Sequence, residues 1–382
     1  MVVSYVIKNK DIEVITFDIQ KSERLQSFSN LRVIKEGLAP RFTDLGAWLQ
    51  SRYKFSCARN VTDFFNSIGI KDLEAFIDIF HCTSLRDTFW VHRAGENISW
   101  SKVSPYRNNY SRLISRYSLE GLLIKDSKNY FSPDVSTDGS FPHTWKWKDD
   151  KIYFLKAGSK FTLGGINSGK EPISEYYAGK VAAYLGFKHV DYELRLHTRA
   201  DKHVEYITEC LCYTSEEIGT ITANELGLKR YQEVYEYCSG LNCSEQFLDM
   251  LFLDCLLMNT DRHFSNIEFF VENDTQRIVG LVPIFDNNFS FLPRFIEGID
   301  IFDRKEYAAR TEESFESLFG FISKHKDYSK PLHQLKRLRL VQPDKCKIAD
   351  KRLEFLNWFL QEQVDYWLSY KAELPANTEK PA

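Results

Sequence analysis

The stretch Leu251–Phe270, LFLDCLLMNTDRHFSNIEFF, joins two apolar segments through a short polar segment. The first apolar segment has helical spacing, and the last residues are apolar and aromatic as in a strand. We therefore predict a buried helix, a polar loop and a strand in this order. A polar loop held between two buried elements is a common place for binding or catalytic residues.

Two residues of this loop, Asp261 and Asn266, have the spacing Asp-x-x-x-x-Asn. Phosphoryl transfer needs a carboxylate that orients the attacking hydroxyl and an oxygen ligand for magnesium, and kinase catalytic loops supply both at this spacing. Further on, Ile278–Asp286 is typical of a strand that delivers a carboxylate to a loop. Mg²⁺ usually takes one or two protein carboxylates and leaves the other positions to phosphate and water. We predict Asp261 as the catalytic residue and Asn266 and Asp286 as metal ligands.

Upstream, Lys156 ends a strand-like segment and Glu175 lies near the start of a helical pattern. Kinases use a strand lysine, paired with a glutamate on a helix, to hold the α- and β-phosphates. We therefore expect Lys156 to bind phosphate and Glu175 to position it. Ser174 is the expected cap of the helix and Gly186 its end.

Pattern changes along the chain divide it into four parts. Residues 1–130 mix helical and strand-like segments and form an accessory region, and 131–212 form a small sheet-rich lobe. Residues 213–373 are mainly helical in pattern, and 374–382 are expected to be a disordered tail. Strands that precede helices in this way indicate an α+β fold.

Composition excludes several classes of partner. A formal net charge of -3 over 382 residues gives no basic character that would favour direct nucleic-acid binding. No apolar run is long enough to cross a membrane, and the first residues do not resemble a signal peptide. The eight cysteines lack the density of a disulfide scaffold, so we expect a cytoplasmic protein with reduced thiols.

Several motifs carry a family resemblance. The run Asn259–Asn266 resembles the N-x-D-x-H-x-x-N catalytic loop of HipA-family kinases, and Val282–Asp286 resembles their P-x-[FY]-D metal motif. More loosely, Ser136–His143 resembles their phosphate loop, S-x-x-G-x-x-x-K, and Ile207–Leu211 their hinge strand. The resemblance covers roughly residues 130 to 370.

The resemblance implies a bilobal protein-kinase-like fold with a mixed N-terminal region and a helical C-terminal lobe. It implies Ser/Thr kinase activity with ATP and Mg²⁺, in which the ATP-binding lobe is the part spanning 131–212. Glu209 and Leu211 would then meet adenine through their backbones. Gly139, Ser140 and His143 would belong to the phosphate loop, although His143 stands where the family often has lysine.

The family also implies partners and a modification. A protein is the expected substrate, and an antitoxin-like regulatory protein is a plausible partner by resemblance. The loop serine that HipA-like kinases autophosphorylate corresponds to Ser136, with Ser140 as the next candidate.

Other interpretations remain open. Small-molecule phosphotransferases share the Asp-x-x-x-x-Asn spacing and the distal aspartate. Their loop usually has a histidine before the aspartate, whereas His263 follows Asp261. An ATP-binding regulatory pseudokinase is the other alternative, against which the intact Lys156 and Asp261 argue. We expect His263 to brace the loop. Arg262 is expected either to bind a phosphorylated residue or to be solvated.

Overall fold

The computed structural model describes residues 2–21, 26–42, 44–53, 65–66, 68–121, 131–137, 139–159, 169–310 and 313–373. The expected tail 374–382 lies outside these residues. The chain forms two compact units: unit 1 comprises Met1–Lys156, Leu211–Ile221 and Phe269–Val279, and unit 2 comprises Ala157–Cys210, Thr222–Glu268 and Gly280–Ala382. Among the described residues, every helix is too short or too polar to cross a membrane.

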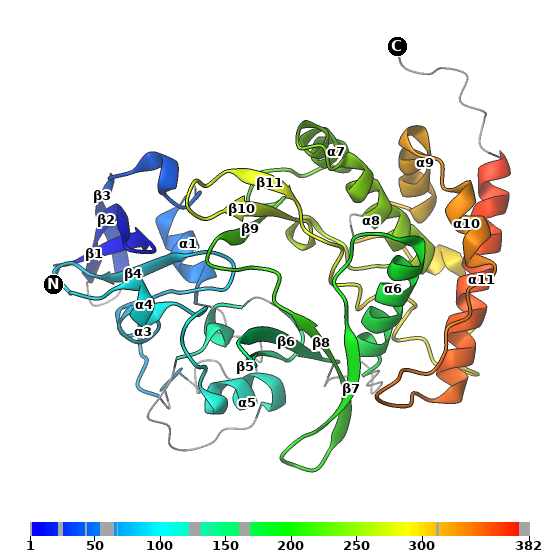
Figure 1. The fold of residues 1–382 in the computed structure, drawn as a ribbon, viewed down its shortest axis with the longest axis horizontal. Coiled ribbons are helices and arrows are strands. Elements are labelled where there is room, and N and C mark those ends of the chain that lie inside the picture. Colours follow the sequence, from blue (N-terminus) through cyan, green and yellow to red (C-terminus); the bar gives the residue numbers. More distant parts are fainter. Residues whose placement is uncertain are drawn as a thin grey trace. The chain divides into compact units, whose positions relative to one another are not determined.

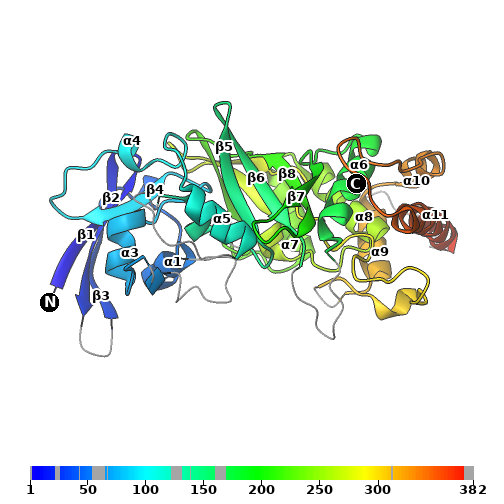
Figure 2. The ribbon, with the colours of Figure 1, turned by 90° about the horizontal axis from the view of Figure 1, so that it is seen from below.

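Unit 1 begins with a four-stranded antiparallel sheet in the order β3-β2-β1-β4. Its strands are β1 (Val2–Asn9), β2 (Ile12–Lys21), β3 (Gln26–Val33) and β4 (Phe89–Arg93). Helices α1 (Leu45–Ser51) and α3 (Leu73–Phe80) cover one face of this sheet (Figure 2). Tyr5 and Phe17 pair across β1 and β2 and share one core with Phe76 and Phe80 of α3. Burial of these large side chains drives the packing of helix on sheet.

Unit 1 also holds short helices, a hairpin and most of a small sheet of order β11-β10-β9. These elements are η1 (Glu36–Leu38), α4 (Trp100–Val103), α5 (Arg112–Glu120), η2 (Pro133–Ser136), β5 (His143–Lys148), β6 (Lys151–Ala157), β9 (Ile218–Thr222), β10 (Glu268–Glu272) and β11 (Ile278–Leu281). Strands β5 and β6 form an antiparallel hairpin, in which Trp145 pairs with Phe154. Asp149 and Asp150 turn it with φ of 52° and 55°, which suits a tight two-residue turn.

The units do not follow the boundaries predicted at 130 and 212. Segments 211–221 and 269–279 belong to unit 1 because polar contacts bind them to the first strands and helices. The Asn9 side chain donates to the Asn273 carbonyl at 2.7 Å, and Trp100 Nε1 donates to Glu216 at 2.6 Å. Such contacts between distant segments leave no periodic trace in the sequence.

Unit 2 is mainly helical (Figure 1). Its elements are α6 (Glu171–Leu185), β7 (Glu193–Thr198), β8 (Val204–Leu211), α7 (Tyr231–Gly240), α8 (Ser244–Leu257), η3 (Phe264–Asn266), η4 (Arg304–Glu306), α9 (Phe315–His325), α10 (Ser329–Leu335) and α11 (Asp350–Glu373). Helix α8 contacts α6, α7, α9 and α11, and it is apolar on nearly every face because it is buried by all of them. With its antiparallel strand pairs and two compact units, the structure confirms the predicted two-lobed α+β fold class.

Two local predictions need correction. Helix α6 begins at Glu171 after Lys170, with Pro172 in its first turn where a missing N–H costs nothing. Ser174 is therefore a buried helical residue and not the cap, and its hydroxyl accepts from Arg352 Nη2 at 3.4 Å. Gly186 does end the helix, with φ of 73°. The helical spacing of the apolar residues Leu353, Phe355, Leu356, Trp358 and Phe359 predicts that they form a buried face, but Trp358 is 43% exposed.

Candidate active site

The predicted catalytic loop follows directly from helix α8. The helix ends at Leu257, and Met258 takes a left-handed conformation with φ of 50°. Near the helix end, the buried carboxylate of Asp254 accepts from Asn259 Nδ2 at 2.8 Å and from Arg262 Nε at 2.9 Å. A carboxylate inside an apolar helix thus fixes the first residues of the loop.

Arg262 is the hub of the loop. Its side chain is 1% exposed, and Nη1 donates to the carbonyls of Asn266 at 3.0 Å and Phe285 at 2.8 Å. Nη2 donates to Asn287 Oδ1 at 2.9 Å. Burial works to lower the pKa of Arg262, but the charge of Asp254 outweighs it and the pKa is raised. Arg262 is therefore neither solvated nor available to a phosphorylated residue, which corrects both expectations, and it binds the catalytic loop to the residues on either side of Asp286.

Asn266 and Asp286 meet as their motifs predicted. Asn266 Nδ2 donates to Asp286 Oδ2 at 2.8 Å, although the residues lie 20 positions apart. Asp286 has φ of 56°, a conformation that costs a non-glycine residue about 1–3 kcal/mol, and its N–H donates to Tyr192 Oη at 3.4 Å. Because Asn266 donates through nitrogen, its amide oxygen and the Asp286 carboxylate are the oxygen donors of the pair. This is a donor set of the kind that Mg²⁺ prefers.

Asp261 stands at the exposed rim of the same loop. Its N–H donates to Asn259 Oδ1 at 3.2 Å, which orients the residue. Its carboxylate forms an ion pair with Arg310, with 2.5 Å between Oδ1 and Nη1. Arg310 lies 49 positions further along and belongs to no motif, so sequence patterns gave no sign of it.

His263 caps the short helix η3. Its Nδ1 accepts the N–H of Ser265 at 3.2 Å, a bracing contact of the kind that the sequence suggested. Burial lowers the pKa of His263, and the positive charge of Arg310 lowers it further. The imidazole is therefore held neutral with Nδ1 as the acceptor.

The predicted phosphate-binding pair is split between the two units. Lys156 ends unit 1, pairs with His143 between β5 and β6, and has its ammonium 5.8 Å from the Phe141 ring centre. Glu175 is buried in unit 2, where Thr208 Oγ1 donates to its carboxylate at 2.8 Å. The pairing of Lys156 with Glu175 stays a prediction.

The phosphate-loop segment has a buried base and an exposed tip. The Ser136 side chain is buried and donates to the Pro133 carbonyl at 3.0 Å, whereas Gly139 and Ser140 are exposed. His143 is also buried, and its Nδ1–H donates to the Phe141 carbonyl at 3.0 Å. A Cβ at Gly139 would lie 3.1 Å from the His143 ring, a tight contact, and the φ of 155° also disfavours other residues there. In this arrangement Ser140 is more accessible to modification than Ser136.

A buried carboxylate that sequence patterns did not single out anchors this segment. Asp134 is fully buried and accepts from Ser132 Oγ at 2.6 Å, the Trp145 N–H at 3.0 Å and Thr144 Oγ1 at 3.2 Å. Burial raises its pKa to about 6 against the lowering effect of these hydrogen bonds. Asp134 thus ties the base of the segment to strand β5.

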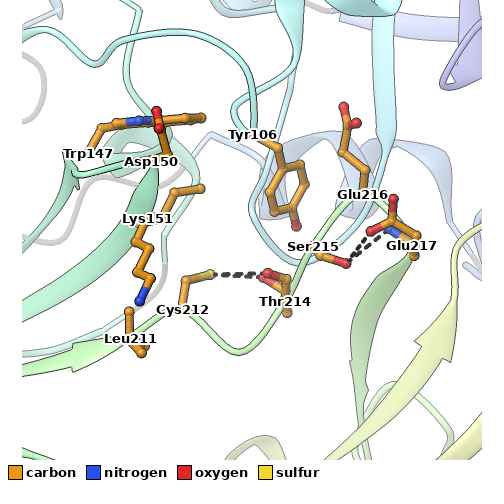
Figure 3. Close-up of a pocket in the computed structure, with 11 residues that line it drawn as sticks. Tyr106, Trp147, Asp150, Lys151, Leu211, Cys212, Thr214, Ser215, Glu216 and Glu217 are labelled. Carbon is orange, nitrogen blue, oxygen red and sulfur yellow. Dashed lines mark hydrogen bonds between the residues drawn. The ribbon is translucent and has the colours of Figure 1, made fainter.

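The predicted hinge residues have different surroundings. Glu209 lies on β8, where its carboxylate forms an ion pair with Arg195 at 2.8 Å. Leu211 borders a pocket of about 430 Å³ in unit 1 (Figure 3). Cys212 lines the same pocket and contacts Thr214 Oγ1 through its sulfur at 3.1 Å. Asp261, Asn266 and Asp286 do not line this pocket, so it is not the predicted phosphoryl-transfer centre.

Comparison with known proteins finds similar solved structures only. No family model matches the chain, and neither does any curated protein. The Helicobacter pylori proinflammatory kinase CtkA is 17% identical, with a TM-score of 0.42, and the match covers 63% of this chain and 95% of that one. HipA of Shewanella oneidensis MR-1, solved with HipB and operator DNA, is 12% identical, with a TM-score of 0.49 over 96% of this chain and 97% of that one.

The Golgi casein kinase is a third similar structure. It is 13% identical, with a TM-score of 0.34, and the match covers 91% of this chain and 95% of that one. The TM-scores of all three lie below 0.5, so we base no step of the functional argument on them.

Proposed function

We propose that this protein is an ATP- and magnesium-dependent kinase that phosphorylates serine or threonine hydroxyls of a protein. The observation that carries the proposal is the contact between Asn266 and Asp286, 2.8 Å between Nδ2 and Oδ2, on a loop that also presents Asp261. The buried Arg262 joins the loop to the residues beside Asp286 through hydrogen bonds of 2.8–3.0 Å. Buried polar networks of this kind hold side chains in one geometry, as catalysis requires.

Each residue has a distinct task in this proposal. When bound, Mg²⁺-ATP supplies the phosphoryl group and a positive charge that stabilises its transfer. Asn266 and Asp286 would hold the metal through one amide and one carboxylate oxygen. Asp261 would orient the substrate hydroxyl and take its proton as the oxygen attacks the γ-phosphorus and the bond to the ADP oxygen breaks.

The ion pair of Asp261 with Arg310 bears on access to this carboxylate. Arg310 occupies Oδ1, so a substrate hydroxyl that approaches this atom must displace the guanidinium. Because the Arg310 side chain is 54% exposed, the displacement is expected to cost only about 0.2–1 kcal/mol. The exposed pair therefore leaves Asp261 within reach of a substrate.

The remaining contacts to ATP are proposed from the motifs. Lys156, positioned by Glu175, would bind the α- and β-phosphates, and the phosphate loop would cover them. The adenine would meet the backbone of the hinge strand. The loop and hinge residues in question are Gly139, Ser140, His143, Glu209 and Leu211.

The direct test is transfer of labelled γ-phosphate from ATP in the presence of Mg²⁺. Wild-type protein is compared with Asp261→Asn and Asp286→Asn, with dephosphorylated casein as an added substrate and circular dichroism as the check of folding. Label on serine or threonine of either protein, lost in both variants, supports the proposal. Folded wild-type protein that binds ATP but labels no protein would contradict it and favour a small-molecule phosphotransferase or a pseudokinase.

A regulatory protein partner is a further part of the proposal, and it rests on the motif resemblance to HipA-like kinases. We expect the partner to lower phosphoryl transfer when it binds. The test is to isolate the tagged protein from its own cells, to identify bound proteins by mass spectrometry and to assay activity with and without them. Purification of the active protein with no bound protein would remove this part of the proposal.

A further inference from the structure

Helix α7 is followed directly by helix α8 (Figure 1), and a cysteine lies on each side of the turn between them. Cys238 is in the last turn of α7, and Cys243 directly precedes α8. The N–H of Cys243 donates to the Cys238 carbonyl at 2.9 Å, and Asn242 makes the tight turn possible with φ of 56°. A direct backbone bond between the two residues fits the short separation that a disulfide requires.

The two thiols have unequal surroundings. Cys238 is fully buried, whereas Cys243 is partly exposed at the N-terminus of a 14-residue helix. The neighbouring Cys238 side chain lowers the pKa of Cys243 against the raising effect of burial, and the Leu281 backbone and the charge of Lys188 lower it further. The Cys243 side chain, together with burial, raises the pKa of Cys238. Cys243 is thus the more accessible thiol, with the lowered pKa, and Cys238 is the buried thiol beside it.

Other partly exposed cysteines differ in this respect. Cys212 and Cys346 are also partly exposed, but burial raises the pKa of both. The sulfur of Cys346 lies near the Leu194 carbonyl at 3.6 Å, and that of Cys212 near a threonine. These two residues therefore serve as internal references for reactivity.

We propose that Cys243 and Cys238 form a thiol pair that reacts with hydroperoxides, with Cys243 as the attacking and Cys238 as the resolving residue. The Cys243 thiolate attacks one peroxide oxygen, the O–O bond breaks, and the leaving oxygen takes a proton as water or an alcohol. Cys243 becomes a sulfenic acid. The Cys238 sulfur then attacks the Cys243 sulfur, the S–O bond breaks, and the hydroxide leaves as water with the proton of Cys238. Two thiols lose two electrons in total, and the hydroperoxide gains them.

The position of the pair links it to the rest of unit 2. Helix α8 begins at the pair and carries Asp254, which fixes the catalytic loop through Arg262. The redox chemistry needs none of the residues of the proposed phosphoryl-transfer centre. It therefore stands or falls separately from the proposed function.

The test uses the full chain and hydrogen peroxide, followed by alkylation with N-ethylmaleimide and peptide mass spectrometry. We expect the peptide that contains both cysteines to lose two hydrogen atoms and to regain them with dithiothreitol. In Cys238→Ser, dimedone should trap a sulfenic acid on Cys243. Wild-type Cys243 should react faster than Cys346, because a lower pKa raises the fraction of thiolate at a given pH. Cys346→Ser is the matched control and should leave the disulfide unchanged.

Two results would overturn the proposal. One is oxidation of Cys243 no faster than that of Cys346 in the wild-type protein, a comparison that needs no variant to fold. The other is a disulfide with the wrong partners. Cys238 would still form a disulfide in Cys243→Ser, or Cys243 would form one with a cysteine other than Cys238.

Discussion

Two arginine–aspartate pairs hold the predicted catalytic loop, and they differ mainly in burial. The Arg262 and Asp254 side chains are 1% and 2% exposed, whereas those of Arg310 and Asp261 are 54% and 25% exposed. The donor–acceptor distances are 2.9 Å and 2.5 Å. The shorter pair is thus the more exposed one, so distance alone does not show which pair stabilises the fold.

Solvation explains the difference. An exposed ion pair is typically worth about 0.2–1 kcal/mol, since water competes for both charges. A buried pair loses about 3–5 kcal/mol when one partner is removed, because the other charge remains uncompensated in the interior. We therefore assign the Arg262 pair to folding of the loop and the Arg310 pair to control of access to Asp261.

The largest expected effect is on stability. Arg262→Met should lower the free energy of unfolding by about 3–5 kcal/mol, because Asp254 would keep a buried and unpaired charge. Arg310→Met, the matched control, should lower it by at most about 1 kcal/mol. Urea denaturation followed by circular dichroism measures both values. Equal losses in the two variants would break the comparison between the pairs.

The sequence predicted much of this site, and the reasons are local. Helix α8, the loop and the strand after it follow from hydrophobic spacing, and the Asn266–Asp286 contact follows from two motifs at kinase spacing. The burial of Arg262 was missed because its partner Asp254 lies eight positions earlier in another element. Asp254, an aspartate among the apolar residues of the helix, was the available signal, since a fully buried carboxylate needs a partner.

Long-range contacts account for the remaining differences. The 49 positions between Asp261 and Arg310 carry no pattern that would connect them. The same holds for Asn9 and Asn273, whose hydrogen bond helps to place residues 269–279 in unit 1. Periodicity identifies a strand such as β10, but it does not identify the segments to which that strand binds.

A second, smaller effect should appear in activity. Arg310→Ala should raise the initial rate of phosphoryl transfer, because Asp261 would no longer have to exchange one partner for another. Because an exposed ion pair stabilises by about 1 kcal/mol or less, its removal can raise the rate of phosphoryl transfer by at most about fivefold. Steady-state assays at low and high salt measure it, and the gain should shrink with salt because screening weakens the pair in the wild type. A rate that falls in the variant would assign Arg310 to substrate or phosphate binding instead.

The smallest effect concerns His263. Its lowered pKa means that the unfolded chain takes up a proton near pH 6.5 before the folded protein does. The contribution of His263 to stability therefore declines as the pH falls below about 6.5. In Arg310→Met its pKa should rise, because a neighbouring positive charge is lost.

Nuclear magnetic resonance titration of the imidazole protons, assigned with His263→Gln, measures this shift. His325 is the control, since burial and then Lys324 lower its pKa. An unchanged His263 titration in Arg310→Met would contradict the ion pair at the rim of the loop.

The most direct test of the central claim is the Mg²⁺ dependence of ATP binding, measured by isothermal titration calorimetry. Wild-type protein and Arg310→Met should bind ATP at least about tenfold more tightly with Mg²⁺ than with a chelator, a difference of about 1.4 kcal/mol. Asp286→Asn, which can still accept the hydrogen bond from Asn266, should lose this difference while it stays folded. ATP affinity that is equal with and without Mg²⁺ in the wild type, or a full Mg²⁺ effect in Asp286→Asn, would contradict a metal site at Asn266 and Asp286.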